Sequence, residues 1–158
     1  MTRSILAIDP GTSRSGWCYM DADKITFAVD DNDLVLTRVG FTDPDDCDLV
    51  IEEFASYGMP IGKSCLDTVL YTGRLMDRWY CGHGREAILI PRRNVKLHLC
   101  GSVRAKDGNV RQALIDRYGG SKAVAVGVKK SPGPLYGCKA DAWSALALAV
   151  TYMDGGFQ

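Results

Sequence analysis

Residues 4–16, SILAIDPGTSRSG, join a short apolar run to a turn. The run Ser4–Asp9 is nearly continuous in apolar residues, which is typical of a buried central strand. The segment PGTSRSG that follows is rich in Gly, Pro and Ser, the residues that favour turns. The sequence therefore predicts a central strand that ends on the carboxylate of Asp9, directly before a turn.

Four more strands are predicted around this one. Residues 16–20 (GWCYM) and 25–29 (ITFAV) follow at short spacing, so we expect these consecutive strands to be antiparallel neighbours. Residues 48–54 (DLVIEEF) predict another buried strand, and residues 87–90 (AILI) a further one. With helices between and after them, these strands predict an α/β fold in which helices cover a sheet.

The remaining segments favour helices and loops. Residues 34–39 predict a strand or a short helix, and residues 62–80 have apolar residues at helical spacing. Asp107 is placed to cap a helix that carries apolar residues on one face. Residues 129–137, with two prolines and two glycines, predict a loop, and residues 140–153 predict a final helix.

The composition is that of a globular protein. The chain has 158 residues, 46% hydrophobic and 24% charged, which suits one domain over residues 1–158. None of its six cysteines forms a C-x-x-C pair, so we expect reduced thiols rather than a zinc site. Without a secretory leader or a long apolar run, the chain is expected to stay in the cytoplasm and off membranes.

Charge is unevenly distributed along a chain whose net charge is zero. Residues 1–60 contain 4 Lys/Arg and 12 Asp/Glu, which gives −8, whereas residues 85–130 contain 11 Lys/Arg and 3 acids, which gives +8. The pattern indicates an acidic half that holds cations and a basic half that holds phosphates. The alternative is two unrelated solvated surfaces.

Three carboxylates stand at the ends of predicted buried elements. Asp9 ends the first strand, Glu52 lies in the strand at residues 48–54, and Asp141 opens the last helix. A buried carboxylate is costly unless it is paired or bound to a metal, and Mg²⁺ prefers oxygen ligands. Three convergent carboxylates suit metal-assisted phosphodiester hydrolysis. The ordinary alternative for each is a helix cap or a surface charge.

Four segments resemble RuvC-type Holliday junction resolvases, and they occur in the order of that family. They are ILAIDPGTSRSG, VIEEF, VKLHLCGSVRAKDGNV and KADAWSALALAVTY, and they span nearly the whole chain. Details such as YGMPIGK and KKSPGPLYG resemble the bacteriophage-encoded branch. The resemblance implies a ribonuclease H-like fold, a mixed five-stranded sheet flanked by helices. It also implies an endonuclease that acts on branched DNA and depends on Mg²⁺, with Mn²⁺ as the alternative ion.

The resemblance also implies roles for individual residues. Asp9, Glu52 and Asp141 match metal-binding and catalytic acids, and Glu53 is a further candidate ligand. Lys96 and Lys106 match catalytic lysines that contact phosphates. Tyr57, and less strongly Phe54, match an aromatic residue that stacks on an unpaired base, and the alternative is that both lie in the core. Other candidate DNA-binding residues come from the basic segment: Arg92, Arg93, Arg104, Lys129 and Lys130.

One position departs from the family. Bacterial members have a second acid one helical turn after the position of Asp141, and this chain has Ser144 there. Residues three apart share a helix face, so Ser144 is expected at the metal site, where a hydroxyl is a poor ligand. Weak occupancy by one of two ions, or a preference for Mn²⁺, would follow.

The function expected from the sequence is therefore Holliday junction resolution. The resemblance also implies a homodimer, because symmetric cleavage of a junction needs two sites related by a two-fold axis. Residues 62–80 are the candidate dimer element, and the alternative is that the apolar face of this helix is wholly internal. A phage-encoded enzyme would act in the cytoplasm of its bacterial host. The alternatives are a broader debranching nuclease that cuts flaps and forks, and a catalytically weak junction-binding module.

Overall fold

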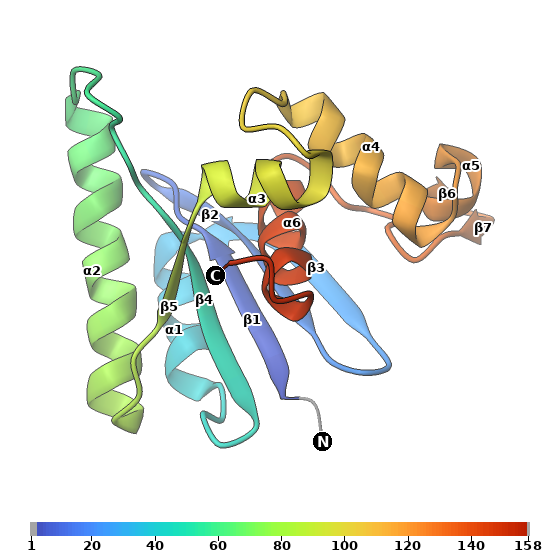
Figure 1. Cartoon of the computed structure of the whole chain (residues 1–158). Helices are drawn as coiled ribbons and strands as arrows, with labels where there is room; N and C mark the ends of the chain where they lie inside the picture. Colours follow the sequence, from blue (N-terminus) through green and yellow to red (C-terminus); the bar gives the residue numbers. More distant parts are fainter. Residues whose placement is uncertain (1–2, 158) are drawn as a thin grey trace.

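Strand β1 (Ser4–Asp9) is the middle strand of a five-stranded sheet with the order β3-β2-β1-β4-β5. The computed structural model describes residues 3–157 (Figure 1). The strands β2 (Arg14–Met20) and β3 (Ile25–Asp31) pair antiparallel, as their close spacing predicts. The strands β4 (Cys47–Glu53) and β5 (Ile88–Pro91) run parallel to β1. The predicted mixed five-stranded sheet is confirmed.

Helices cover both faces of the sheet. Figure 1 shows α1 (Asn32–Phe41) and α2 (Lys63–His83) on one side. The other side carries α3 (Arg92–Cys100), α4 (Asp107–Tyr118) and α6 (Ala142–Met153). A short helix α5 (Lys122–Ala125) and the two-stranded hairpin of β6 (Gly127–Val128) and β7 (Ser131–Pro132) lie beyond the end of α4. The predicted α/β architecture is therefore also confirmed.

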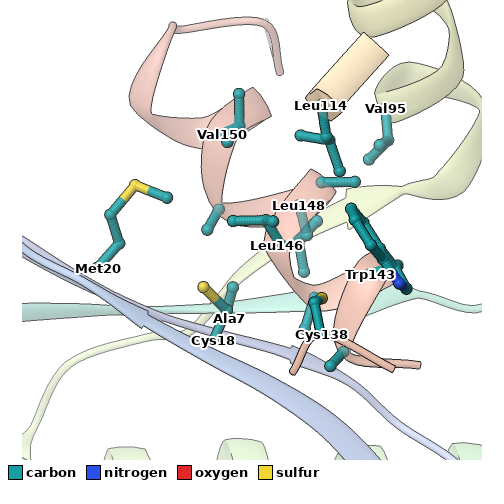
Figure 2. Packing of buried hydrophobic residues seen from close by; sticks show 14 of the residues in the cluster. Ala7, Cys18, Met20, Val95, Leu114, Cys138, Trp143, Leu146, Leu148 and Val150 are labelled. Carbon is teal, nitrogen blue, oxygen red and sulfur yellow. The ribbon is translucent and has the colours of Figure 1, made fainter. Parts of the chain in front are cut away.

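Helix α6 forms the core on its side of the sheet. It is rich in Ala and Leu on all sides, as expected of a helix that is buried between a sheet and other helices. Figure 2 shows Trp143 and Leu148 of α6 packed with Leu114 of α4 and with Ala7 and Cys18 of the sheet. Each Leu-sized side chain buried here contributes about 1.5–3 kcal/mol to folding. This packing fixes where α6 begins relative to the strands.

The opposite face has a smaller core. Tyr71, Leu75 and Trp79 of α2 pack against Leu6 and Ile51 of the sheet. The alternation of side chains along a strand explains the division, because successive residues point to opposite faces. The three tryptophans of the chain are all buried in these two cores: Trp17, Trp79 and Trp143.

Four local predictions need correction or completion. Residues 34–39 belong to a helix, α1, and residues 92–100 form α3, which the sequence did not indicate because only Val95 of α3 is buried. Asp107 is not the N-cap of α4, because Lys106 holds that position and its N–H donates to the side chain of Asn109. Residues 129–137 are not entirely loop, because β7 and its turn lie there. Two-residue strands are too short to show a periodic pattern.

Two wider expectations concern membranes and thiols. Within residues 3–157, no helix combines the length and the apolar character that crossing a membrane requires. All six cysteines are free thiols, and Cys18, Cys47 and Cys138 are buried.

Candidate active site

Two of the predicted acids lie together at one edge of the sheet. Because β1 and β4 are parallel and Ile8 pairs with Ile51, the next residues, Asp9 and Glu52, lie side by side where these strands end. Both acids continue the set of alternate side chains that faces α6. Glu53 belongs to the alternate set that faces α1 and α2. Because its side chain points to the opposite face of the sheet, Glu53 is not a candidate ligand of this site.

The third acid is brought to this edge by α6. Asp141 is the N-cap residue of α6, as the sequence predicted for a residue that opens the helix. Its backbone lies against Gly16 of β2, where an added Cβ would collide with the carbonyl oxygen of Asp141. Gly16 is therefore required for this close approach, which brings the start of α6 to the end of β1.

Asp9 is repelled by both of the other acids, and Asp9 and Glu52 are largely buried. Burial, together with the nearby charges of Glu52 and Asp141, raises the pKa of Asp9 to about 8. Burial also raises the pKa of Glu52, although the neighbouring guanidinium of Arg92 opposes the shift. A cation at this position would relieve the repulsion. Such perturbed carboxylates are typical of functional sites.

Arg92 contributes a positive charge inside this acidic group. It follows β5 directly, so it stands at the same sheet edge as the acids. Its Nη1 lies 3.0 Å from Oε2 of Glu52 and donates to the hydroxyl of Ser144 at 3.3 Å. Its Nη2 lies 2.6 Å from Oδ1 of Asp107. Sequence reasoning assigned Arg92 only to the DNA surface and missed its contact with the acids.

Ser144 points at the acids, as its position one turn after Asp141 predicted. Its hydroxyl accepts a hydrogen bond from Arg92. Ser144 also opposes the rise in the pKa of Asp9, so it stands close to both the arginine and the first acid.

The donor set suits a hard divalent cation, although its arrangement is not yet that of a metal centre. Asp9, Glu52 and Asp141 offer only carboxylate oxygens, which Mg²⁺ and Mn²⁺ accept. Across residues 3–157, no three His, Cys, Asp or Glu side chains stand close enough together to hold an ion as they are. Glu52 is instead engaged by Arg92. An ion held by all three acids would compete with Arg92 for Glu52.

The two lysines predicted to be catalytic differ in their distance from the acids. Lys96 of α3 is close enough for its charge to lower the pKa of Glu52 and of Asp107. Lys106 is exposed at the start of α4, and the acids of the site are not among its contacts. The structure therefore brings Lys96 to the site and leaves Lys106 on the adjacent surface.

The other candidate DNA-binding residues lie at the surface. Phe54 and Tyr57 are 38% and 60% exposed, so the alternative that both lie in the core is wrong. They follow β4 directly, next to Glu52, and Tyr57 has a φ of 48° in the left-handed region. Exposed basic side chains also occur on α3, on the segment before α4 and on the β6–β7 turn: Arg93, Arg104, Lys129 and Lys130.

Comparison with solved structures shows which known fold this chain has. No family model and no curated protein matches the sequence. Among solved structures, RuvC of Thermus thermophilus matches with a TM-score of 0.66 and 17% identity, over 98% of this chain and 97% of that one. T. thermophilus RuvC in complex with a Holliday junction substrate matches with a TM-score of 0.65 and 18% identity, over 99% and 98%. The chain has the fold of RuvC. The RuvC fold is shared over nearly the full length of both chains.

Proposed function

We propose that this protein is a metal-dependent, structure-selective endodeoxyribonuclease that resolves Holliday junctions. One observation carries the proposal: Asp9 and Glu52 end neighbouring parallel strands beside the start of α6, where Asp141 stands, on a fold shared with RuvC. One of the RuvC structures with this fold is bound to a Holliday junction substrate. The four sequence segments that resemble the resolvases include all three acids.

The proposed reaction is hydrolysis of a DNA phosphodiester. The oxygen of a water molecule forms a bond to phosphorus, one phosphorus–oxygen ester bond breaks, and the departing oxygen takes up a proton. A divalent cation, when bound, supplies an activated water and neutralises charge on the phosphate. Asp9, Glu52 and Asp141 would hold that cation through their carboxylate oxygens. Lys96 would add positive charge where the phosphate develops negative charge.

The residues around the acids suit a branched duplex. Tyr57 and Phe54 lie exposed just beyond Glu52, where an aromatic ring can stack on an unpaired base. Several basic side chains belong to segments on the same side of the sheet as α6 (Figure 1): Arg93, Arg104, Lys106, Lys129 and Lys130. Contacts from such residues to phosphates would position DNA without reading its sequence.

The substrate range can be tested with a panel of labelled DNAs. We expect Mg²⁺-dependent nicking of a four-way junction, abolished by EDTA, and little cutting of a linear duplex of the same sequence. A flap and a fork in the same panel separate a junction resolvase from a broader debranching nuclease. Equal cutting of linear and branched DNA would contradict the proposal.

The catalytic acids can be tested with a matched pair of variants. Glu52→Gln removes a proposed ligand and should lower junction nicking by about 100-fold or more, as loss of a group that acts in the transition state does. Glu86→Gln makes the same change at an exposed position before β5 and should retain full activity. Equal activity of the two variants would remove Glu52 from the site.

A further inference from the structure

The guanidinium of Arg92 contacts the oxygen atoms of three side chains, two of them carboxylates. Glu52 lies on one side of it at 3.0 Å, Asp107 on another at 2.6 Å, and the hydroxyl of Ser144 at 3.3 Å. Its side chain is 31% exposed, so it borders both the acids and solvent. Arginine keeps its charge at every pH that a protein normally meets. A permanent cation therefore stands within the acidic group.

Because position 144 holds a serine, a second metal ion would bind poorly next to Arg92. Ser144 and Asp141 share a face of α6, so a ligand at position 144 would complete a second ion's shell. A serine hydroxyl is a weak ligand for Mg²⁺, whereas carboxylates are strong ones. The Ser144 oxygen instead accepts a hydrogen bond from Arg92. A neutral side chain and a guanidinium thus stand together where a second ion would need a carboxylate.

A small cavity next to Arg92 could receive a phosphate. It has a volume of about 230 Å³, and its lining includes two arginines, two carboxylates and one hydroxyl: Arg92, Arg111, Asp107, Asp141 and Ser144. The guanidinium of Arg111 is held over the ring of Trp143, with its central carbon 5.0 Å from the ring centre. Guanidinium groups match phosphate oxygens with paired hydrogen bonds. Two arginines therefore face a hollow that adjoins the proposed metal ligands.

We propose that Arg92 is the second cation of this site, so that each protomer binds one divalent ion, and that Arg92 faces the scissile phosphate in place of a second ion. The inference rests on the proposed function, because it assigns a charge to the same site. On ion binding, Glu52 leaves the guanidinium for the ion, and Arg92 turns its freed hydrogen-bond donors toward DNA.

Counting bound Mn²⁺ tests the inference without relying on activity. The signal of free Mn²⁺ in electron paramagnetic resonance is followed as wild-type protein is added, and we expect one tightly bound ion per protomer. The double variant Arg92→Ala/Ser144→Asp should bind two ions, because it removes the resident cation and supplies a carboxylate. The matched control Arg93→Ala/Ser144→Asp should still bind one. Two tight ions in the wild type, or equal counts in both double variants, would overturn the inference.

The single variant Arg92→Ala separates a catalytic cation from a structural one. Because Glu52 is released, Mn²⁺ should bind about threefold tighter or more, whereas junction nicking should fall by about tenfold or more. Weaker Mn²⁺ binding together with a lower melting temperature would make Arg92 a structural residue and overturn the inference. A wild type that binds no Mn²⁺ and nicks no junction would overturn the proposed function itself. A wild type that nicks junctions with two bound ions would overturn only the inference.

Discussion

At the scale of single residues, the burial of Asp9 lowers the stability of the folded chain near neutral pH. Its pKa is raised to about 8, chiefly by burial and then by the charges of Glu52 and Asp141. In the unfolded chain an aspartate has a pKa of about 3.9, so its ionisation near neutral pH favours the unfolded state. The destabilisation starts above the unfolded pKa and grows until the pH reaches the folded pKa. Stability of the metal-free protein should therefore fall as pH rises across this window.

Replacing Asp9 with Asn should for this reason stabilise the metal-free protein at pH 7. We expect a gain of about 1 kcal/mol or more, which raises the melting temperature by about 2–4 °C for a chain of this size. Mn²⁺ should then raise the melting temperature of the wild type but not of the variant. Scanning calorimetry with EDTA or Mn²⁺ measures both effects. A variant that melts below the wild type in EDTA would show that Asp9 is not strained.

The sequence predicted these acids but not their partner. Asp9, Glu52 and Asp141 could be found because each carboxylate interrupts or ends an apolar element, where a charge is costly. Arg92 looked like one more cation in a basic segment, although its place directly after β5 was a usable signal. Parallel strands end at the same sheet edge, so a residue that follows β5 must lie near those that end β1 and β4. Its pairing with Glu52 depends on side-chain packing that no local pattern reveals.

At the scale of elements, three helices meet at one ion cluster. Asp154, at the end of α6, accepts two hydrogen bonds from Arg117 of α4, at 2.7 and 2.8 Å. It also lies 2.9 Å from Nε2 of His98 on α3. The contacts lower the pKa of Asp154, mainly through the bond from Arg117. A carboxylate with a lowered folded pKa adds stability above its unfolded pKa, and the gain is lost as pH falls through the folded value.

The variant Asp154→Asn should accordingly be less stable than the wild type at pH 7. We expect a loss of about 1 kcal/mol, because the cluster is partly exposed and its ion pairs are screened. The difference should shrink as the pH is lowered toward 3. Urea unfolding at several pH values measures it, with the exposed Asp116→Asn as control. A loss that is the same at pH 7 and pH 3 would contradict the assigned role.

Elements were predictable where they carry a strong apolar pattern. The strands and α6 were found because they are short continuous runs or long apolar helices. Helix α3 was missed because it buries only Val95, and its polar surface gives no stripe to detect. The β6–β7 hairpin was missed because its strands, Gly127–Val128 and Ser131–Pro132, are too short to show a periodic pattern.

At the scale of the whole molecule, the acidic and basic halves of the sequence form different elements of the fold. The acidic half of the sequence supplies β1 and β4 with Asp9 and Glu52, whereas the basic half forms α3, α4 and the β6–β7 hairpin beside α6. The chain therefore sets the proposed cation ligands beside the proposed phosphate-binding side chains, although its net charge is zero. DNA binding should weaken as salt rises, since each phosphate contact releases a counterion.

The outer face of α2 is where we expect a second copy to dock. Leu66, Leu70 and Tyr80 are 53%, 71% and 55% exposed, and Gly73 leaves open space between them. We predict that Leu70→Glu converts a dimer into a monomer in light scattering and lowers junction nicking. Val124→Glu, which changes an apolar residue on α5 that is 59% exposed, should remain dimeric. A wild type that is monomeric at working concentration would rule out this interface.

The central claim is that Asp9, together with Glu52 and Asp141, cleaves branched DNA with a divalent ion. The most direct measurement is the rate of nicking of a labelled four-way junction in Mg²⁺ by wild type, Asp9→Asn and Asp23→Asn. Asp23 is an exposed acid in the turn at the opposite end of the sheet. The account predicts nicking by the wild type and by Asp23→Asn, and none by Asp9→Asn. Nicking that survives in Asp9→Asn, or a wild type that binds the junction without cutting it in Mg²⁺ or Mn²⁺, would contradict it.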